Sequence, residues 1–503
     1  MREEYVIGVD VGTTGVKAVA VTRGGAVISE AEAEHHLSSP FPGWAEENPE
    51  DWWQNVLKTV GQVIRGVGRG ARAIGVSGMV PALVLLDGRG EILRPSIQQN
   101  DARTAEELAW LRAALDEEAF FQETGQTINQ QIVPPKLLWL RRHEPEIYRQ
   151  IRWILGSYDF ITHRLSGILS VEQNWALEAG FLRAEDRQWY LPMFQASGIT
   201  PEYVPPVRQP HEIVGGSLAD IEEATGLPRG TPVVAGSADH IAAALAAGLT
   251  RPGDLVLKFG GAGDALYCVD RFTPDRRLFL DYHDIPGLYV LNGCMAASGS
   301  LIKWFRDQFA KELSGLNDAY ERLDREAADV PPGSGGLVVL PYFLGEKTPL
   351  FDPLARGVIA GLTLSHTRAH VFRAFLEAVV YGFAHHVEIL KELGYPVGRV
   401  LVMDKGAQSP LWRQITSDVL GLPVYHLAGG HTGSAYGVAY VAGVAAGFWD
   451  WRHIEQIVSV RTVHEPDEAA HSTYRDLYRV YRELYPHLRE DLHRLSIIQT
   501  AGR

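Results

Sequence analysis

Hydrophobic positions near the start of the chain fall into two short runs that are separated by a turn of small and polar residues. Residues 5–10 and 16–21 are rich in valine and other β-forming residues, and Gly12 and Gly15 bracket two threonines between them. Short β-rich runs joined by such a turn predict a β-hairpin. The same order of strand, glycine-rich turn and strand returns at residues 254–267.

The repetition extends beyond the two hairpins. When Gly12 is placed on Gly260, later strands predicted at residues 73–77 and 399–403 also correspond, because each runs into a turn that contains glycine. A repeat of this length is too long for a solenoid and indicates a duplicated domain. We therefore predict an α/β protein made of two related halves, with a cleft between them.

The expected boundary lies near Pro252 and Gly253, which interrupt the pattern between the two hairpins. The predicted domains are residues 1–250 and 251–503. Helices are expected between the strands, beginning at residue 49 and covering residues 104–115, 135–142, 241–247 and 467–488.

Composition restricts the possible functions. The chain of 503 residues is too long for one core and is expected to form two to four domains. It has 47 basic and 61 acidic residues and a net charge of −14, which argues against nucleic acid or an anionic membrane as a partner. The N-terminus has no secretory pattern and no apolar run reaches the ~20 residues of a membrane span, so a cytoplasmic enzyme is expected.

The two cysteines, Cys268 and Cys294, do not form a CxxC pair, so neither a disulfide framework nor a zinc site is expected. The remaining candidate partner is a small molecule, and assembly as a homodimer stays open.

The first hairpin offers groups that can hold phosphate. Gly12, Thr13 and Thr14 supply backbone N–H groups and hydroxyls, and Lys17 adds a positive charge. Asp10 ends the first strand, where a carboxylate can bind Mg²⁺ directly or through water. From the hairpin alone, a plain turn with a solvated Asp10 is the alternative.

A second candidate follows the strand at residues 231–235. Asp239 falls at a helix start on the carboxyl edge of a sheet, where open α/β folds bind ligands. An ionised carboxylate there can take a proton from a sugar hydroxyl, whereas the alternative is a helix cap by Asp239 or Ser237. His240 either contacts substrate or closes the helix start. The polar run at residues 98–103 suits sugar hydroxyls or a capped loop.

Motifs over residues 5–486 resemble the FGGY carbohydrate kinases, and among these most closely the kinases of xylulose. The most specific match begins at Leu340 and runs through Gly345 and Asp352 to Leu364, with His370 and Glu377 following at the family's spacing. Further matches are Gly8 to Ala18, Asn100 to Arg103, Lys136 to Trp139, Ser157 to Phe160 and Arg164 to Gly167.

The resemblance implies two ribonuclease-H-like domains of the actin-like and hexokinase-like fold, with ATP and Mg²⁺ in the interdomain cleft. It implies that Asp239 is the catalytic base and that Asp10 serves metal and phosphate. The residues expected on the nucleotide side are Gly12, Thr13, Thr14, Lys17, Gly260, Gly261, Ala262, Gly406 and Ala407. Those expected to contact the sugar are Met79, Val80, Asn100, Arg103, Asp239 and His240.

Several positions depart from the family pattern. Val80 stands where the xylulose kinases carry a histidine, and Gln99 stands where a tryptophan is usual. On the nucleotide side, Gly261 lacks an expected hydroxyl, and Asp404 and Lys405 replace glycines.

We therefore predict ATP-dependent phosphorylation of a small ketose or polyol, with D-xylulose as the first candidate and another sugar, polyol or sugar acid as the alternative. Alternatives of another class are a non-catalytic sugar-sensing relative and an actin-like filament or chaperone ATPase.

Overall fold

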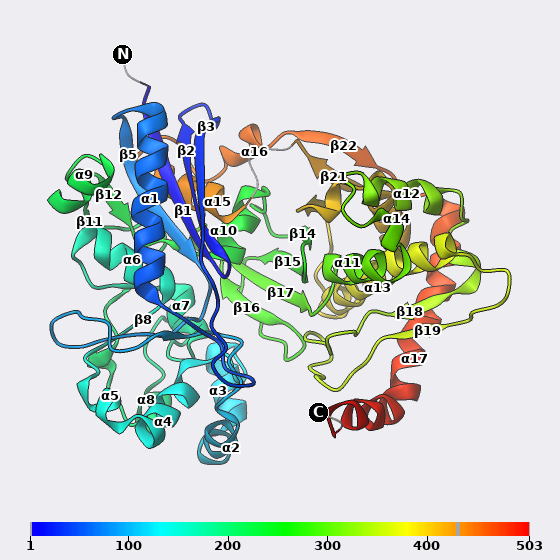
Figure 1. Cartoon of the computed structure of the whole chain (residues 1–503), viewed down its shortest axis with the longest axis horizontal. Coiled ribbons are helices and arrows are strands. Elements are labelled where there is room, and N and C mark those ends of the chain that lie inside the picture. Colours follow the sequence, from blue (N-terminus) through cyan, green and yellow to red (C-terminus); the bar gives the residue numbers. More distant parts are fainter. Residues whose placement is uncertain (1–2, 429–432, 502–503) are drawn as a thin grey trace.

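The computed structural model describes residues 3–428 and 433–501. Two seven-stranded mixed sheets form the centres of two lobes (Figure 1). The first sheet has the order β11 (Ile213–Gly216), β12 (Pro232–Val234), β5 (Ala71–Gly78), β1 (Tyr5–Gly12), β2 (Gly15–Thr22) and β3 (Val27–Glu34), and β13 (Ser237–Ala238) also pairs with β5. The second has the order β16 (Phe279–Tyr282), β17 (Tyr289–Met295), β15 (Gly263–Val269), β14 (Asp254–Phe259), β20 (Arg399–Met403), β21 (Val424–Leu427) and β22 (Val460–His464).

Both sheets are built on the same plan, so the predicted α/β class is confirmed. An antiparallel hairpin, β1–β2 or β14–β15, lies beside a parallel strand, β5 or β20. In the first hairpin Gly12 pairs with Gly15, and in the second Phe259 pairs with Gly263. The second turn is therefore one residue longer than the first. The boundary expected near residue 250 falls between α10 (Asp239–Ala246) and β14.

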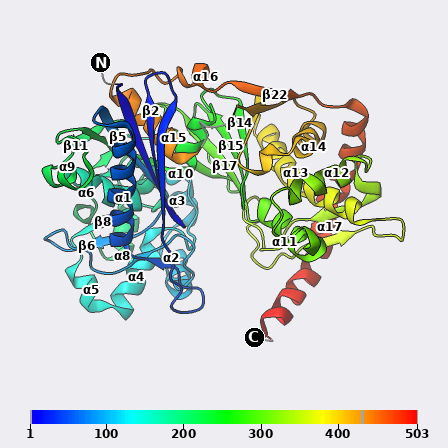
Figure 2. The ribbon, with the colours of Figure 1, turned by 45° about the horizontal axis from the view of Figure 1, so that its top comes forward.

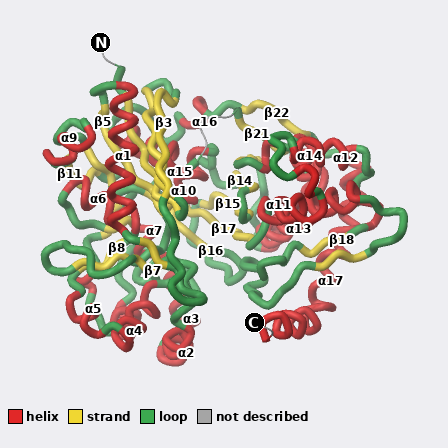
Figure 3. The backbone as a smooth tube through the Cα atoms, in the orientation of Figure 1, coloured by secondary structure: helices red, strands yellow, loops and turns green. Residues whose placement is uncertain are grey.

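Helices cover the sheets on both faces (Figure 3). The first half contains α1 (Pro49–Val67), α2 (Ala105–Ala114), α3 (Glu117–Thr124), α4 (Val133–His143), α5 (Pro145–Gln150), α6 (Ser157–Ser166), α7 (Gln173–Glu178), α8 (Leu191–Ser197) and α9 (Ala219–Thr225). Of these, α1 and α6 pack on the first sheet, whereas α2, α5 and α8 pack on α4. The second half contains α11 (Gly299–Phe309), α12 (Ala319–Ala328), α13 (Arg368–Glu392), α14 (Pro410–Leu420), α15 (Ser434–Ala445), α16 (Ile454–Ile457) and α17 (Glu468–Ala501).

Short strand pairs complete the lobes. They are β4 (Glu46–Glu47) with β7 (Ser96–Ile97), β6 (Val84–Leu86) with β8 (Trp153–Leu155), β9 (Val171–Glu172) with β10 (Val207–Arg208), and β18 (Val338–Leu340) with β19 (Val358–Ala360). The helix expected from residue 49 is α1, and Asn48 caps it by accepting a hydrogen bond from the Glu50 N–H. The predicted C-terminal helix continues to Ala501 and runs along the outer side of the second lobe (Figure 2). Within the described residues, we find no helix whose length and hydropathy suit a membrane span.

One helix from the second half of the chain packs on the first sheet. Helix α15 contacts β1, β2, β5 and α10, while α1 covers the opposite face (Figure 1). Glycines allow this close approach: a Cβ atom on Gly8 would lie 1.9 Å from the Ala435 carbonyl oxygen, and one on Gly437 would lie 1.8 Å from the Ala242 carbonyl oxygen. The two sequence halves are therefore interlocked, and α10, which begins with Asp239, is held by α15.

We predict that Gly437→Ala destabilises the protein because its methyl group would overlap the backbone of α10. The expected loss is about 1–3 kcal/mol, seen as a lower thermal unfolding midpoint. Gly88→Ala is the matched control, since a Cβ atom there would meet no atom within 4 Å. Equal midpoints for the two variants would show that the α10–α15 contact does not require glycine.

Candidate functional site

Three strands bring polar side chains to one edge of the first sheet. Asp10 on β1 pairs with Ser77 on β5, and Ser77 pairs with Ser237 on β13. Asp239 follows two residues later as the first residue of α10. The Ser77 hydroxyl donates a hydrogen bond of 2.8 Å to Asp10 Oδ1. Because parallel strands end at the same edge, residues far apart in sequence meet there.

The carboxyl group of Asp10 lies in an environment that disfavours its negative charge. Burial is the larger cause and the nearby Asp239 carboxylate the second, and together they raise the pKa of Asp10 to about 7. The hydrogen bond from Ser77 and the charges of Lys258 and Lys17 act in the opposite direction without restoring the usual pKa. A further cation beside Asp10 would relieve this repulsion.

A cavity of about 240 Å³ adjoins Asp239 and is lined by both halves of the chain. The first half contributes Val80 and His240, and the second contributes Lys258 and Asp264. Amide side chains also line it, namely Gln99, Gln126, Asn129, Gln131 and Asn292. Amides offer both donors and acceptors, which is what a polyhydroxylated ligand requires.

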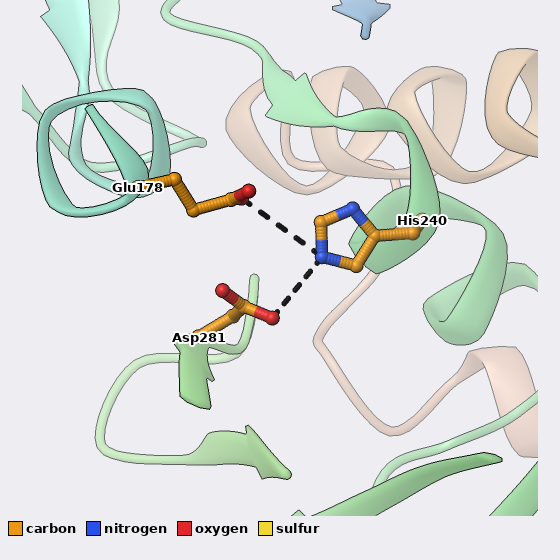
Figure 4. A group of neighbouring side chains, drawn as sticks. All are labelled: Glu178, His240 and Asp281. Atoms are coloured by element: carbon orange, nitrogen blue, oxygen red, sulfur yellow. Dashed lines mark hydrogen bonds and ion pairs between the residues drawn. The ribbon is translucent and has the colours of Figure 1, made fainter. Parts of the chain in front are cut away.

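His240 is enclosed by carboxyl groups (Figure 4). Its Nε2 lies 3.2 Å from Asp281 Oδ2 and 4.0 Å from Glu178 Oε1, and its Nδ1 lies 3.4 Å from Asp239 Oδ1. Burial alone would lower the pKa of His240, but hydrogen bonds with Asp239 and Asp281 outweigh burial and hold the pKa well above its usual value. The ring is therefore a fixed imidazolium next to Asp239.

Lys258 supplies a positive charge from the second lobe. It lies on β14 directly opposite Asp264, and the two side chains are 3.2 Å apart. Burial opposes its charge, but the carboxylates of Asp264, Asp404 and Asp239 raise the pKa of Lys258 overall. Lys258 therefore keeps its positive charge in the cavity. A charged ammonium group in this position is suited to bind the oxygens of a phosphate chain.

The glycine turns predicted to bind nucleotide lie at the ends of the hairpins. Thr13 and Thr14 are exposed at the first tip, and Gly261 and Ala262 are exposed at the second. The N–H groups of residues 298–300, at the start of α11, donate to the Gly260 and Gly261 carbonyls and fix the second turn.

The predicted adenosine-side residues lie close to the second hairpin. Gly406 and Ala407 form a short 3₁₀ turn after β20. A Cβ atom on Gly406 would lie 2.7 Å from both Phe259 and Trp412, so glycine allows this turn to approach the end of β14.

Val80, Asp239, His240 and Ala262 are the predicted residues that line the cavity, and besides Asp10 and the other turn residues described above, four more lie outside its lining. Lys17 lies directly opposite Asp10, but its ammonium group pairs with Glu30 and Glu32 on β3, at 3.1 Å each. Met79 is buried in the core beside the cavity-lining Val80.

The other two belong to the loop before α2. Asn100 is exposed. The Arg103 guanidinium is almost fully buried, forms ion pairs with Asp101 and Glu46 at 2.7 Å, and stacks 3.6 Å above the Trp44 ring. These partners hold the Arg103 guanidinium within the loop, although its Nη1 has no hydrogen-bond partner among the described residues, and Arg103 does not line the cavity.

Comparison with known protein families agrees with the resemblance found in the sequence. The models of the N-terminal and C-terminal domains of the FGGY family of carbohydrate kinases match residues 5–246 and 274–446. The chain belongs to the FGGY family of carbohydrate kinases. The predicted enzyme class, an ATP-dependent carbohydrate kinase, and the predicted actin-like fold are therefore confirmed.

Several of the proteins similar to this chain are xylulose kinases. The chain of this FGGY kinase is 31% identical to the xylulose kinase of Escherichia coli K12 over 96% of its length and 99% of that protein, and 28% identical to the xylulose kinase of Bacillus subtilis 168 over 97% and 98%. Its fold is similar to the crystal structure of xylulose kinase from Rhodospirillum rubrum, with a TM-score of 0.91, 44% identity, and coverage of 97% of this chain and 100% of that one.

Sequence reasoning missed several residues that line the cavity of this FGGY kinase. For Lys258 a signal was present: it stands two residues before the first glycine of the second hairpin, as Asp10 does in the first. Glu178 and Asp281 carry no local motif, because α7 and β16 meet His240 only through the tertiary fold.

We predict that Asp10→Asn stabilises the protein at alkaline pH when metal and nucleotide are absent. In the folded state the pKa of Asp10 is raised to about 7, whereas an unfolded aspartate titrates near 3.9. The wild type therefore loses stability as the pH rises between these values, and the asparagine variant does not.

Thermal unfolding in EDTA should give a higher midpoint for Asp10→Asn than for wild type at pH 8, and the difference should shrink towards pH 5. Asp270→Asn, at an exposed position after β15, is the control and should show no such trend. A lower midpoint for Asp10→Asn at pH 8 would contradict the electrostatic argument.

Proposed function

We propose that this FGGY kinase transfers the terminal phosphoryl group of ATP to a hydroxyl of a small ketose or polyol, and that D-xylulose is an acceptor. The observation that carries the proposal is the position of Asp239, at the mouth of an amide-lined cavity and beside Asp10. The names of the similar kinases support xylulose as the first acceptor to test. In this proposal the enzyme acts in the cytoplasm on small molecules.

Asp239 is the proposed general base. Its Oδ1 accepts a hydrogen bond of 2.6 Å from the His240 N–H, which leaves Oδ2 to accept the proton of the acceptor hydroxyl. The His240 ring lies beside this carboxylate, with Nδ1 3.4 Å from Oδ1, and Lys258 lines the same cavity. Proton removal and attack on the phosphorus atom can then occur together.

Asp10 is the proposed partner of Mg²⁺. The residues fit such an ion, because the Asp10 carboxyl is buried, repelled by Asp239 and bonded directly only to a serine hydroxyl. Carboxylate oxygen is the ligand type that Mg²⁺ prefers, usually with several waters retained. When bound, the ion would neutralise the charge of the phosphate oxygens.

The two hairpin turns are the proposed phosphate sites. Gly12, Thr13 and Thr14 approach from the first lobe, and residues 260–262 with Lys258 approach from the second. Gly406 and Ala407 are the proposed contacts on the adenosine side. Backbone N–H groups in glycine turns can point at phosphate oxygens without side-chain obstruction.

An ADP-release assay across acceptors tests the proposed function. The panel comprises pentuloses, hexuloses, tetritols, glycerol and aldonates, so it also covers the alternative of another sugar, polyol or sugar acid. We expect release of ADP that depends on acceptor and Mg²⁺, with D-xylulose among the best acceptors. Calorimetric sugar binding without ADP release for any acceptor would favour the sugar-sensing alternative.

We predict that Asp239→Asn lowers kcat for the best acceptor by about 10²–10⁴-fold, the range expected when general-base catalysis is lost. ATP binding, measured by calorimetry, should remain within a few-fold of wild type because the proposed phosphate contacts are intact. Asp270→Asn serves again as the control and should retain full turnover. Wild-type turnover in Asp239→Asn would remove Asp239 from the mechanism.

A further inference from the structure

Glu178, the last residue of α7, presents a carboxyl group to the cavity whose hydrogen bonding is incomplete. Its Oε1 is shielded from solvent and has no hydrogen-bond partner among the described residues, while the side chain as a whole is 17% exposed and lines the cavity. The nearest polar contact, His240 Nε2, is 4.0 Å away, which exceeds hydrogen-bonding distance. Buried polar groups are almost always paired, so an unpaired one at a ligand cavity indicates where a ligand group binds.

The neighbours of Glu178 cannot turn to satisfy it. Asp281 is nearly fully buried on β16 and is paired with His240 Nε2 at 3.2 Å. The His240 ring is also held on its other side by Asp239, whose Oδ1 lies 3.4 Å from Nδ1. Because both neighbours are fixed, the partner of Glu178 must come from the cavity itself.

The His240 ring separates two ends of the acceptor site. Asp239 lies on the Nδ1 side of the ring and Glu178 on the Nε2 side. An acceptor whose reacting hydroxyl is at Asp239 must extend past the ring before a second hydroxyl reaches Glu178. Val80, on another wall of the cavity, offers only apolar contact.

We propose that Glu178 is a specificity-determining residue that binds an acceptor hydroxyl distant from the one that is phosphorylated. His240 and Asp281 pair with each other, so neither competes with the acceptor hydroxyl for Glu178. The inference rests on the proposed role of Asp239, since that role places the reacting hydroxyl. It implies that acceptors with long enough carbon chains, such as pentuloses, bind better than glycerol, which does not extend to Glu178.

The test compares Glu178→Met, which keeps the length of the side chain but removes its oxygens, with the conservative Glu178→Gln. For Glu178→Met we expect the KM for D-xylulose to rise about 10- to 100-fold, the loss typical of a buried hydroxyl that is left without its hydrogen-bond partner. The KM for ATP and the kinetics with glycerol should stay within about twofold. Glu178→Gln retains an oxygen and should recover most of the loss. Glu185→Met, at an exposed position, is the control.

Calorimetry with D-xylulose in the absence of ATP separates this inference from the proposed function. If the wild type binds D-xylulose and Glu178→Met binds it at least tenfold more weakly, the inference stands even when no phosphoryl transfer is measured. Equal binding by both proteins would overturn the inference while leaving the kinase activity in place. Binding of Mn²⁺ without sugar that is lost in Glu178→Met would also overturn it, because the group would then be a cation site.

Discussion

Repulsion between two carboxylates, Asp10 and Asp239, is the constraint on which the rest of the site depends. The sheet of the first lobe places both at one edge, where burial strengthens their interaction. Ser77 is a neutral donor and only partly compensates. Of the two lysines whose charges act on Asp10, Lys258 has the larger effect and comes from the other lobe. The charge of Lys258 reaches this edge of the sheet only when the two lobes are together. The relative position of the lobes therefore affects the chemistry proposed between them.

The duplicated architecture explains how opposite charges come to face each other. Asp10 and Lys258 occupy corresponding positions in the two hairpins, two residues before the first glycine. Duplication thus supplies the two similar turns that are the proposed phosphate sites. Divergence at this position gives a carboxylate, Asp10, in one hairpin and an ammonium group, Lys258, in the other. Helix α15 also connects the two halves, because it belongs to the second half of the sequence and packs on the sheet that carries Asp10.

Much of the fold could be predicted from the sequence because its signals are local. The hairpins follow from β-rich runs and glycine turns, and α1 follows from Asn48 and the residues after it. Side-chain direction could not be predicted, because distant partners decide it. Glu30 and Glu32 hold Lys17 beside β3, and Trp44 with Glu46 holds Arg103 in the interior. The charge of a residue and its position in a family motif were therefore not enough to predict whether its side chain lines the cavity.

Recognition of the acceptor also depends on side chains that distant segments bring to the cavity. Val80 replaces a polar residue expected from the family pattern, so one wall of the cavity has lost hydrogen-bonding capacity. Another part of the cavity contains the charged side chain of His240, which pairs with Asp281. An oxygen of Glu178 remains without a hydrogen-bond partner among the described residues. A polar ligand gains most where the protein leaves a buried group unsatisfied. Recognition of the acceptor in this kinase should accordingly depend more on α7 and β16 than on the end of β5.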